Sequence, residues 1–193
     1  KGFEFKDLGL LIIDEEQKFG VGAKEKLRQL KASVDTLTLT ATPIPRTLAM
    51  TLYGDLHVSI IDELPPGRKP VQTIHYSNQR RQAINQFIRQ QIEAGRQVYV
   101  VYPLIKENEK LDLADLQNGY TALCETFPNY RISMVHGQMK ASDKDEQMRR
   151  FACGETQLLV ATTVIEVGVN VPNASVMIIE NAERFGLSQL HQL

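Results

Sequence analysis

Short apolar runs alternate with longer segments of helical periodicity along most of this chain. The first run, residues 8–13, reads Leu-Gly-Leu-Leu-Ile-Ile without polar alternation, a pattern typical of a strand buried on both faces of a parallel sheet. Residues 78–94 instead repeat apolar side chains at helical spacing, and Gly95 follows them as a stop. This helical stripe comprises Ile84, Phe87, Ile88 and Ile92. The alternation predicts an α/β fold in which helices cover both faces of parallel sheets.

The predicted elements form two lobes separated by a proline-rich stretch. In the first lobe we expect strands over residues 8–13, 35–39 and 57–61 and helices over 22–31 and 45–53. In the second we expect strands over 71–76, 97–102, 131–135, 156–160 and 175–180 and helices over 78–94, 111–126, 142–152 and 186–192. Pro65, Pro66 and Pro70 with Gly67 exclude a continuous helix or central strand between the lobes. The pattern therefore predicts a partial first lobe over 1–62, a linker over 63–70 and a nearly complete second lobe over 71–193.

The first apolar run ends abruptly in two adjacent carboxylates, Asp14 and Glu15. Ligands of parallel α/β proteins gather at the carboxyl ends of strands. A carboxylate pair there suits magnesium-nucleotide chemistry, in which Asp14 would hold the metal and Glu15 would orient or deprotonate the attacking water. Taken alone, the pair favours a solvated loop or a helix start, where acidic side chains complement the helix dipole, over a nucleotide site.

Thr40-Ala41-Thr42 ends the second predicted strand, and two prolines follow at positions 43 and 45. Thr42 is a good capping residue for the helix that the prolines introduce. The hydroxyls of Thr40 and Thr42 are also suited to reach back to the acidic pair and to report the state of a bound phosphate. The sequence leaves both roles open.

These two segments, together with four later ones, carry a resemblance to a known family. Asp14 to Gln17 and Thr40 to Thr42 resemble motifs II and III of superfamily 2 helicases. The later segments that carry the resemblance are Ile60 to Pro70, Val135 to Met139, Ala161 to Pro172 and Arg184 to Leu193. The chain as a whole resembles RecG, a bacterial ATP-dependent DNA helicase that remodels branched DNA in recombination and repair. Residues 1–46 look more like the transcription-repair coupling factor, a related double-stranded DNA translocase. The resemblance implies that both lobes are RecA-like.

The resemblance also implies roles for individual residues. Gln17, Thr40, Thr42 and Gln192 would couple the lobes, with Arg184 and Gln189 near the same motif, and Glu166, Gly168 and Asn170 would face the nucleotide. Asn170 stands where many members carry Asp, so it brings no charge. DNA would be contacted by Arg46, His136, Gly137, Thr162 and Thr163. Helix capping for the threonines, a loop hydrogen bond for His136 and a solvated position for Arg46 are the alternatives.

Two parts of such a motor are missing from the 193 residues. The sequence contains no Gly-x-x-x-x-Gly-Lys-Ser/Thr phosphate loop, and it ends at Gln192-Leu193, where the arginine-rich motif VI of the family begins. The resemblance implies ATP and Mg²⁺ as cofactors, both requiring the missing loop. We therefore expect the chain alone to be inactive, and we expect its incomplete first lobe to expose apolar surface through which it self-associates.

Composition restricts the partners without selecting the function. The net charge is −1, from 22 basic and 23 acidic residues, so any DNA-binding surface must be a local patch. No apolar stretch is long enough to span a membrane, and Cys124 and Cys153 are isolated, which predicts buried free thiols in the bacterial cytoplasm. A coupling-factor type translocase and a non-catalytic DNA-binding or interaction module remain alternative functions.

Overall fold

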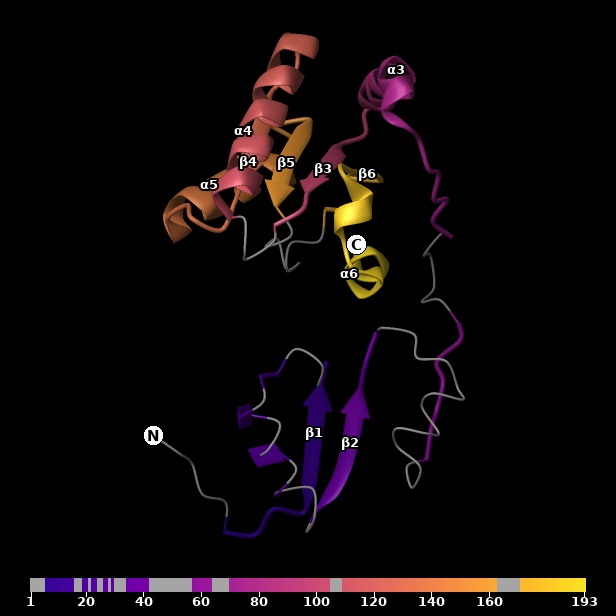
Figure 1. Cartoon of the computed structure of the whole chain (residues 1–193), viewed down its shortest axis with the longest axis vertical. Helices are drawn as coiled ribbons and strands as arrows, with labels where there is room; N and C mark the ends of the chain where they lie inside the picture. Colours follow the sequence, from indigo (N-terminus) through magenta and orange to yellow (C-terminus); the bar gives the residue numbers. More distant parts are fainter. Residues whose placement is uncertain are drawn as a thin grey trace. The chain divides into compact units, whose positions relative to one another are not determined.

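The chain is described here by a computed structural model that covers residues 6–15, 19–20, 22–23, 26–27, 29, 34–41, 57–63, 70–104, 109–162 and 171–193. It divides into two compact units, one formed by residues 1–68 with 187–193 and the other by residues 69–186. Each unit contains a parallel sheet (Figure 1). Among the helices that the structure describes, none has the length and apolar content that crossing a bilayer requires.

The first unit is built on two parallel strands, β1 (Leu10–Asp14) and β2 (Asp35–Leu39). Ile12 pairs with Leu37, so alternate residues of the two strands share a face. One face carries Leu10, Ile12, Leu37 and Leu39, whose exposed fractions lie between 44% and 58%. Of the described residues between the strands, 22–23, 26–27 and 29 are helical. The unit also contains helix α6 (Leu187–Gln192).

The second unit contains a four-stranded parallel sheet. Its strand order is β4 (Ile132–Val135), β5 (Leu158–Thr162), β3 (Val98–Tyr102) and β6 (Val176–Ile179). The two inner strands, β3 and β5, are the most buried, and every residue of β5 is fully enclosed. Their uninterrupted apolar sequences fit this position, because an inner parallel strand is covered on both faces.

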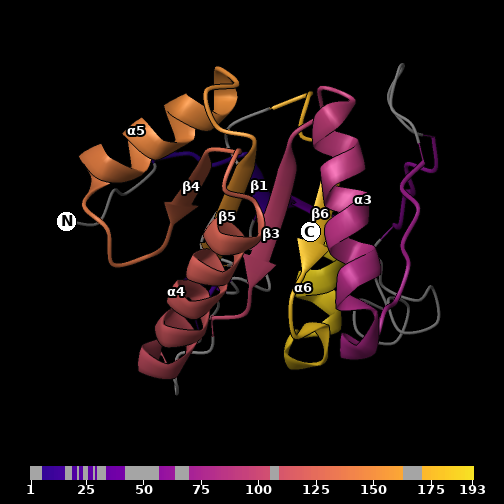
Figure 2. The ribbon, with the colours of Figure 1, turned by 90° about the horizontal axis from the view of Figure 1, so that it is seen from above.

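Helices cover both faces of this sheet (Figure 2). The 3-10 turn η2 (Asn78–Arg80) leads into α3 (Arg81–Glu93), which packs with α4 (Glu109–Thr126) on one face. Helix α5 (Ala141–Ala152) covers the other face. The first layer buries Ile88, Ile92 and Leu116 against the sheet, and the second buries Phe151. A short 3-10 turn, η4 (Ala182–Arg184), follows β6 and precedes α6.

Two of the predicted strands are wrong. Residues 57–61 and 71–76 have no regular secondary structure, and Ile61 and Val71 are 94% and 88% exposed. Both segments have the composition of strands, but strand propensity acts only where a neighbouring strand offers hydrogen bonds and a covered face. The predicted helix over 45–53 lies outside the described residues.

Two predictions about individual side chains are also wrong. In the predicted apolar stripe of α3, Ile88 and Ile92 are buried but Phe87 is 44% exposed. Of the two free cysteines, Cys124 is half-buried whereas Cys153 is exposed. By contrast, Gly95 has a φ of 79°, so it ends α3 in the left-handed conformation that glycine adopts without strain.

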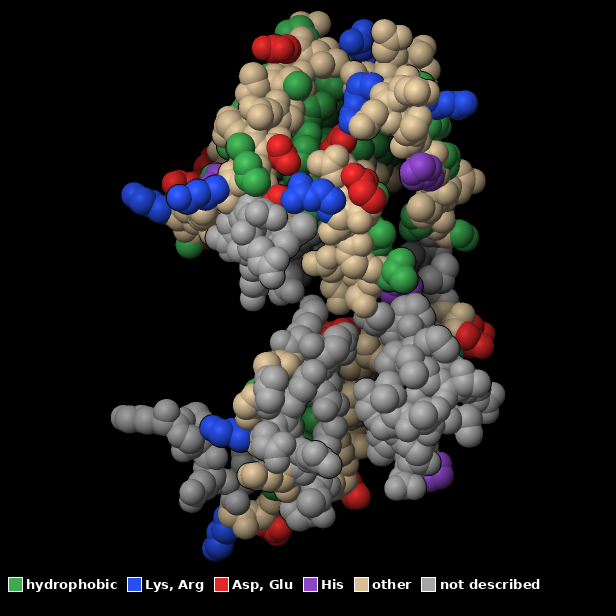
Figure 3. All heavy atoms as spheres, viewed as in Figure 1, with side chains coloured by type: hydrophobic (Ala, Val, Ile, Leu, Met, Phe, Trp, Pro, Cys, Tyr) green, Lys and Arg blue, Asp and Glu red, His purple; other side chains and the backbone are tan. Residues whose placement is uncertain are grey.

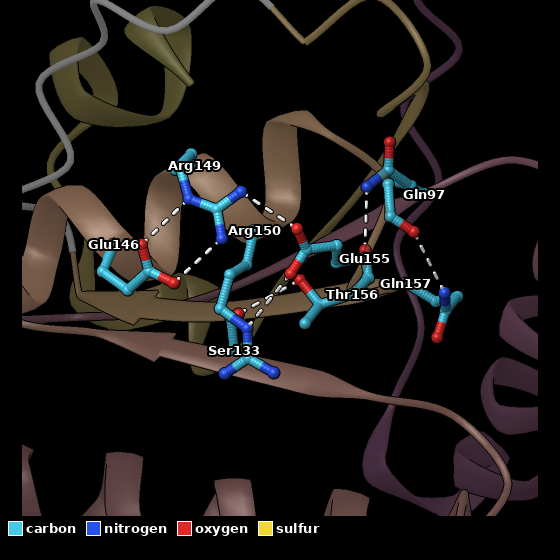
Figure 4. A network of polar contacts seen from close by, with 9 residues as sticks. Gln97, Ser133, Glu146, Arg149, Arg150, Glu155, Thr156 and Gln157 are labelled. Atoms are coloured by element: carbon cyan, nitrogen blue, oxygen red, sulfur yellow. Dashed lines mark hydrogen bonds and ion pairs between the residues drawn. The ribbon is translucent and has the colours of Figure 1, made fainter.

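A buried polar network closes the amino end of the second sheet (Figure 4). Gln97 is 4% exposed, and its side-chain nitrogen donates to the carbonyl oxygens of Phe151 and Thr156, at 2.6 and 2.8 Å. The hydroxyl of Ser133 is bonded to that of Thr156 at 3.0 Å, and the Asn173 side chain donates to the Gln97 side-chain oxygen at 3.3 Å. These contacts tie together the segments from which the strands start.

Replacing Gln97 with leucine tests this network. Gln97→Leu keeps a side chain of similar size but removes the donor to the buried carbonyl oxygen of Thr156. It also removes one of the donors to the carbonyl oxygen of Phe151, which still accepts from the N–H of Gly154 at 3.0 Å. We therefore expect a loss of about 2 kcal/mol in the free energy of unfolding. Urea denaturation measures the loss. Gln90→Leu, at an exposed position of α3, is the matched control and should stay within about 0.5 kcal/mol of the unsubstituted chain. Equal stability of the two variants would contradict the role of the network.

Candidate functional site

The carboxyl ends of β1 and β2 bring the predicted acidic pair beside the predicted threonine segment. Asp14 is the last residue of β1 and pairs with Leu39, the last residue of β2. The backbone N–H of Glu15 then donates to the carbonyl oxygen of Leu39 at 3.0 Å. The strand register therefore fixes Asp14 and Glu15 next to Thr40, as expected from the parallel arrangement.

Glu15 adopts an unusual backbone conformation at this strand end. Its φ is 51°, in the left-handed region that side chains other than glycine rarely occupy. One carboxylate oxygen accepts a hydrogen bond from the backbone N–H of Ala41 at 2.7 Å. A charge-assisted bond of this length holds the carboxylate in one orientation. Backbone strain at a polar strand end is a common property of functional positions.

Asp14 is exposed at the same edge. Magnesium in nucleotide sites is bound through one or two carboxylates, with phosphate oxygens and water completing the shell. An exposed carboxylate at a strand end fits that requirement. Within the part of the chain that the structure describes, no group of three or more His, Cys, Asp or Glu side chains is arranged to hold a metal by itself.

Helix α6 contributes to the first unit near the same segment. The Nε2 atom of His191 lies 3.1 Å from the carbonyl oxygen of Ala41. Gln192, which the resemblance assigns to coupling, is the next residue and the last of α6. Two backbone groups of Ala41 are thus engaged, its N–H by Glu15 and its C=O by His191.

A second group of predicted residues lies at the carboxyl edge of the sheet in residues 69–186. Val135 of β4 pairs with Ala161 of β5, so His136 and Thr162 follow at neighbouring strand ends. His136 Nδ1 and Thr162 Oγ1 are both buried without a hydrogen-bond partner. Buried polar atoms normally have partners, so the absence of partners at these two atoms makes this strand edge a candidate binding position.

The surroundings of His136 favour its neutral form. Burial lowers the pKa of His136, and the positive charge of Lys144 lowers it further. The ammonium group of Lys144 donates to the carbonyl oxygen of Gly137 at 2.9 Å, which fixes the turn that follows β4. His136 is therefore neutral near pH 7 and able to donate from one ring nitrogen and accept at the other.

Seven predicted site residues lie outside the described residues. They are Gln17, Thr42, Arg46, Thr163, Glu166, Gly168 and Asn170. The structure brings Asp14, Glu15 and Thr40 together in one unit and His136 and Thr162 together in the other.

Sequence reasoning did not identify the Ala41 amide or Asp112. Every residue carries a backbone amide, so no side-chain pattern signals the first. Asp112 is fully buried and bonded to Arg184 at 2.6 Å. The only signal for it in the sequence is an acidic residue at a position where an amphipathic helix turns inward.

Residues 68–193 match the profile of the helicase conserved C-terminal domain. This chain therefore belongs to that family of helicase domains. It is 51% identical over 190 residues to the ATP-dependent DNA helicase RecG of Synechocystis, a match that covers 98% of this chain and 23% of that protein. It is 50% identical over 190 residues to RecG of Thermotoga maritima, with coverage of 98% and 24%.

A solved structure described as RecG bound to a three-way DNA junction is 46% identical to this chain, with a TM-score of 0.65. The match covers all of this chain and 24% of that one. The resemblance to RecG and the RecA-like parallel α/β fold, both predicted from the motifs and the apolar pattern, are confirmed. The matches to RecG cover 98% of this chain and thus extend into residues 1–46. The chain spans about a quarter of the length of these relatives.

The lowered pKa of His136 predicts a pH dependence of stability. Because the pKa in the folded state lies below the unfolded value of about 6.5, the unfolded chain binds more protons on acidification. This contribution is fully present above the unfolded pKa and is lost as the pH falls from there toward the folded pKa. We expect the urea midpoint to fall between about pH 7.5 and pH 5.5, and to fall less in His136→Gln.

The exposed His75 supplies the control for this measurement. His75→Gln should keep the pH dependence of the unsubstituted chain. If His136→Gln and His75→Gln show the same pH dependence, the effect of burial and of Lys144 on His136 is absent in solution.

Proposed function

We propose that this chain is the central part of an ATP-driven DNA helicase of the RecG type, which remodels branched DNA. The observation that carries the proposal is the bond between the Glu15 carboxylate and the Ala41 amide, at 2.7 Å, across two adjacent strand ends. This bond links Glu15, which is suited to direct an attacking water, to the segment around Ala41, which can transmit the hydrolysis of ATP to the rest of the protein. The relatives named RecG support the same assignment.

In this proposal Asp14 holds Mg²⁺ bound with ATP, and Glu15 orients the water or accepts its proton. When bound, Mg²⁺ neutralises charge on the phosphate oxygens. Thr40 and Thr42, with Gln17 and Gln192, couple the site to the other lobe. Glu166, Gly168 and Asn170 face the nucleotide. ATP binding would close the two lobes and hydrolysis would reopen them, as in other motors that alternate between two states.

DNA is held in this proposal by residues at the strand ends of the second unit, His136, Gly137, Thr162 and Thr163, and by Arg46. The unpaired buried atoms of His136 and Thr162 support it, because a phosphate or base edge would supply the missing partner. In Figure 3, positive and negative side chains are intermingled on the visible face of residues 69–186. Contact with DNA would therefore depend on individual hydrogen bonds more than on a broad basic surface. Branched DNA is proposed because a similar structure is bound to a three-way junction, and the bacterial cytoplasm is the proposed location.

The test compares ATP hydrolysis by this chain and by the longer protein that contains it, on forked and linear duplexes. We expect no turnover from the chain alone, because its sequence lacks a phosphate loop. We expect turnover strongest on forks from the longer protein, reduced at least about 100-fold by Glu15→Gln. Asp35→Asn, which removes an exposed carboxylate from the opposite end of the same sheet, should leave the rate unchanged.

Each alternative function corresponds to a different result. Equal turnover on forked and linear duplexes would favour a coupling-factor type translocase. A folded longer protein that binds DNA without hydrolysing ATP would favour the non-catalytic module. ATP hydrolysis by the 193-residue chain itself, abolished by Glu15→Gln, would refute the proposal that this chain is only the central part of the motor.

We also propose that the isolated chain self-associates through the aliphatic face of β1 and β2, with a second copy as the occupant. Leu10, Ile12, Leu37 and Leu39 are 44–58% exposed, and a contiguous apolar sheet face of this kind is unstable in water. Sedimentation velocity should show a weight-average sedimentation coefficient that rises with protein concentration. Ile12→Lys should abolish this rise. Leu111→Lys, at an isolated apolar residue of α4 that is 64% exposed, is the control. A monomer at every concentration would contradict the proposal.

A further inference from the structure

Ala41 lies just beyond the paired part of the first sheet. Strand β2 ends at Leu39, and a backbone bond from the N–H of Glu15 to the carbonyl oxygen of Leu39 closes the strand ends. The position of Ala41 therefore depends on other contacts, because backbone outside a strand ladder opens readily. Two such contacts are present among the described residues, one from Glu15 and one from His191, and all three residues belong to the same unit.

The contact with His191 has a defined donor. The Nε2 atom of His191 lies 3.1 Å from the carbonyl oxygen of Ala41, across 150 positions of sequence. A carbonyl oxygen can only accept a hydrogen bond, so Nε2 carries the hydrogen and donates it. The N–H of Leu193 donates to the carbonyl oxygen of Gln189 at 3.0 Å, which closes the turn of α6 that carries His191. The ring thus reaches Ala41 from a helical turn.

This hydrogen bond contributes little to the stability of the fold. Both His191 and Ala41 are exposed. Water competes for exposed hydrogen-bonding groups, so a neutral bond of this kind changes the free energy of unfolding only slightly. Its main effect is on the orientation of the Ala41 backbone.

Holding the carbonyl group of Ala41 also restricts its N–H. A residue has only two soft backbone dihedrals, and these alone set the direction of its N–H relative to its C=O. A hydrogen bond weakens steeply when its donor turns away from the acceptor. The 2.7 Å bond from the Ala41 N–H to the Glu15 carboxylate therefore depends on this orientation. The direction of the carboxylate is linked to His191 through a single residue.

We propose that His191 is a positioning residue, which holds the Ala41 carbonyl group so that the Ala41 N–H keeps the Glu15 carboxylate directed at the attacking water. This inference rests on the proposed function, in which Glu15 directs that water. His191 itself touches neither the nucleotide nor the water in this proposal. Its loss would slow the hydrolysis of bound ATP and leave ATP binding intact.

The experiment uses the longer helicase and three variants. His191→Leu removes the donor to Ala41. His191→Gln places an amide nitrogen close to the position of Nε2, so it can donate to the same carbonyl oxygen. His57→Leu, at an exposed histidine of the same unit that is not among the predicted site residues, is the matched control.

The first measurement is steady-state ATP hydrolysis on forked DNA. We expect His191→Leu to lower kcat about tenfold at an unchanged KM for ATP, because a misdirected carboxylate affects the chemical step and not binding. His191→Gln should restore most of the kcat, and His57→Leu should match the unsubstituted protein. All three variants should unfold at the same urea concentration as the unsubstituted protein, so a smaller folded fraction does not account for the lower kcat.

The second measurement is amide hydrogen exchange at Ala41, without nucleotide. Exchange should accelerate about fivefold in His191→Leu, as expected for the loss of one hydrogen bond, and should stay unchanged in His191→Gln and His57→Leu.

The outcomes separate the two levels of inference. An unchanged kcat or unchanged exchange at Ala41 in His191→Leu would overturn the positioning role. Equal impairment of His191→Leu and His191→Gln would overturn it as well, because the donated hydrogen bond would then not be the cause. If the unsubstituted protein hydrolyses no ATP, the proposed function fails, and exchange at Ala41 still decides whether His191 holds this residue.

Discussion

Parallel pairing of neighbouring strands constrains where chemistry can occur in this chain. In a parallel ladder the carboxyl ends of adjacent strands share one edge, so polar residues that follow different strands meet there. The pairing of Asp14 with Leu39 places Glu15 beside Thr40 and Ala41. The pairing of Val135 with Ala161 likewise aligns the strand ends that carry His136 and Thr162. Residues far apart in the sequence become neighbours through backbone hydrogen bonds alone.

The two edges of the larger sheet differ in how well their polar groups are paired. At the amino edge, the Gln97 side chain is bonded to Phe151 near the end of α5, to Thr156 before β5 and to Asn173 before β6. At the carboxyl edge, His136 Nδ1 and Thr162 Oγ1 lack partners. An unpaired buried polar atom costs free energy, so these two atoms lower the stability of the folded chain at that edge. Ligand sites of parallel α/β proteins likewise lie at the carboxyl edge of the sheet.

The sequence predicted best those features that depend on local pattern. Uninterrupted apolar runs located β3 and β5, because an inner strand is recognisable from its own residues. Residues 57–61 and 71–76 have the same kind of pattern, yet a strand also needs a partner that the local sequence does not reveal. The meeting of Asp14 and Glu15 with Thr40 followed from the fold class, whereas the bond to the Ala41 amide involves no side-chain signal. The pair between Asp112 and Arg184 joins positions 72 residues apart and depends on how α4 packs.

The left-handed conformation of Glu15 has a consequence for variants that arise at this position. A glycine there would relieve backbone strain of about 1 kcal/mol, which offsets the loss of the exposed, charge-assisted hydrogen bond to the Ala41 amide. The folded state would thus keep nearly its full stability without the carboxylate. Cells remove proteins mainly when they unfold, so a chain altered at Glu15 would escape degradation. It would accumulate to the same level as the unsubstituted chain, so a measurement of abundance would not reveal the loss of the carboxylate.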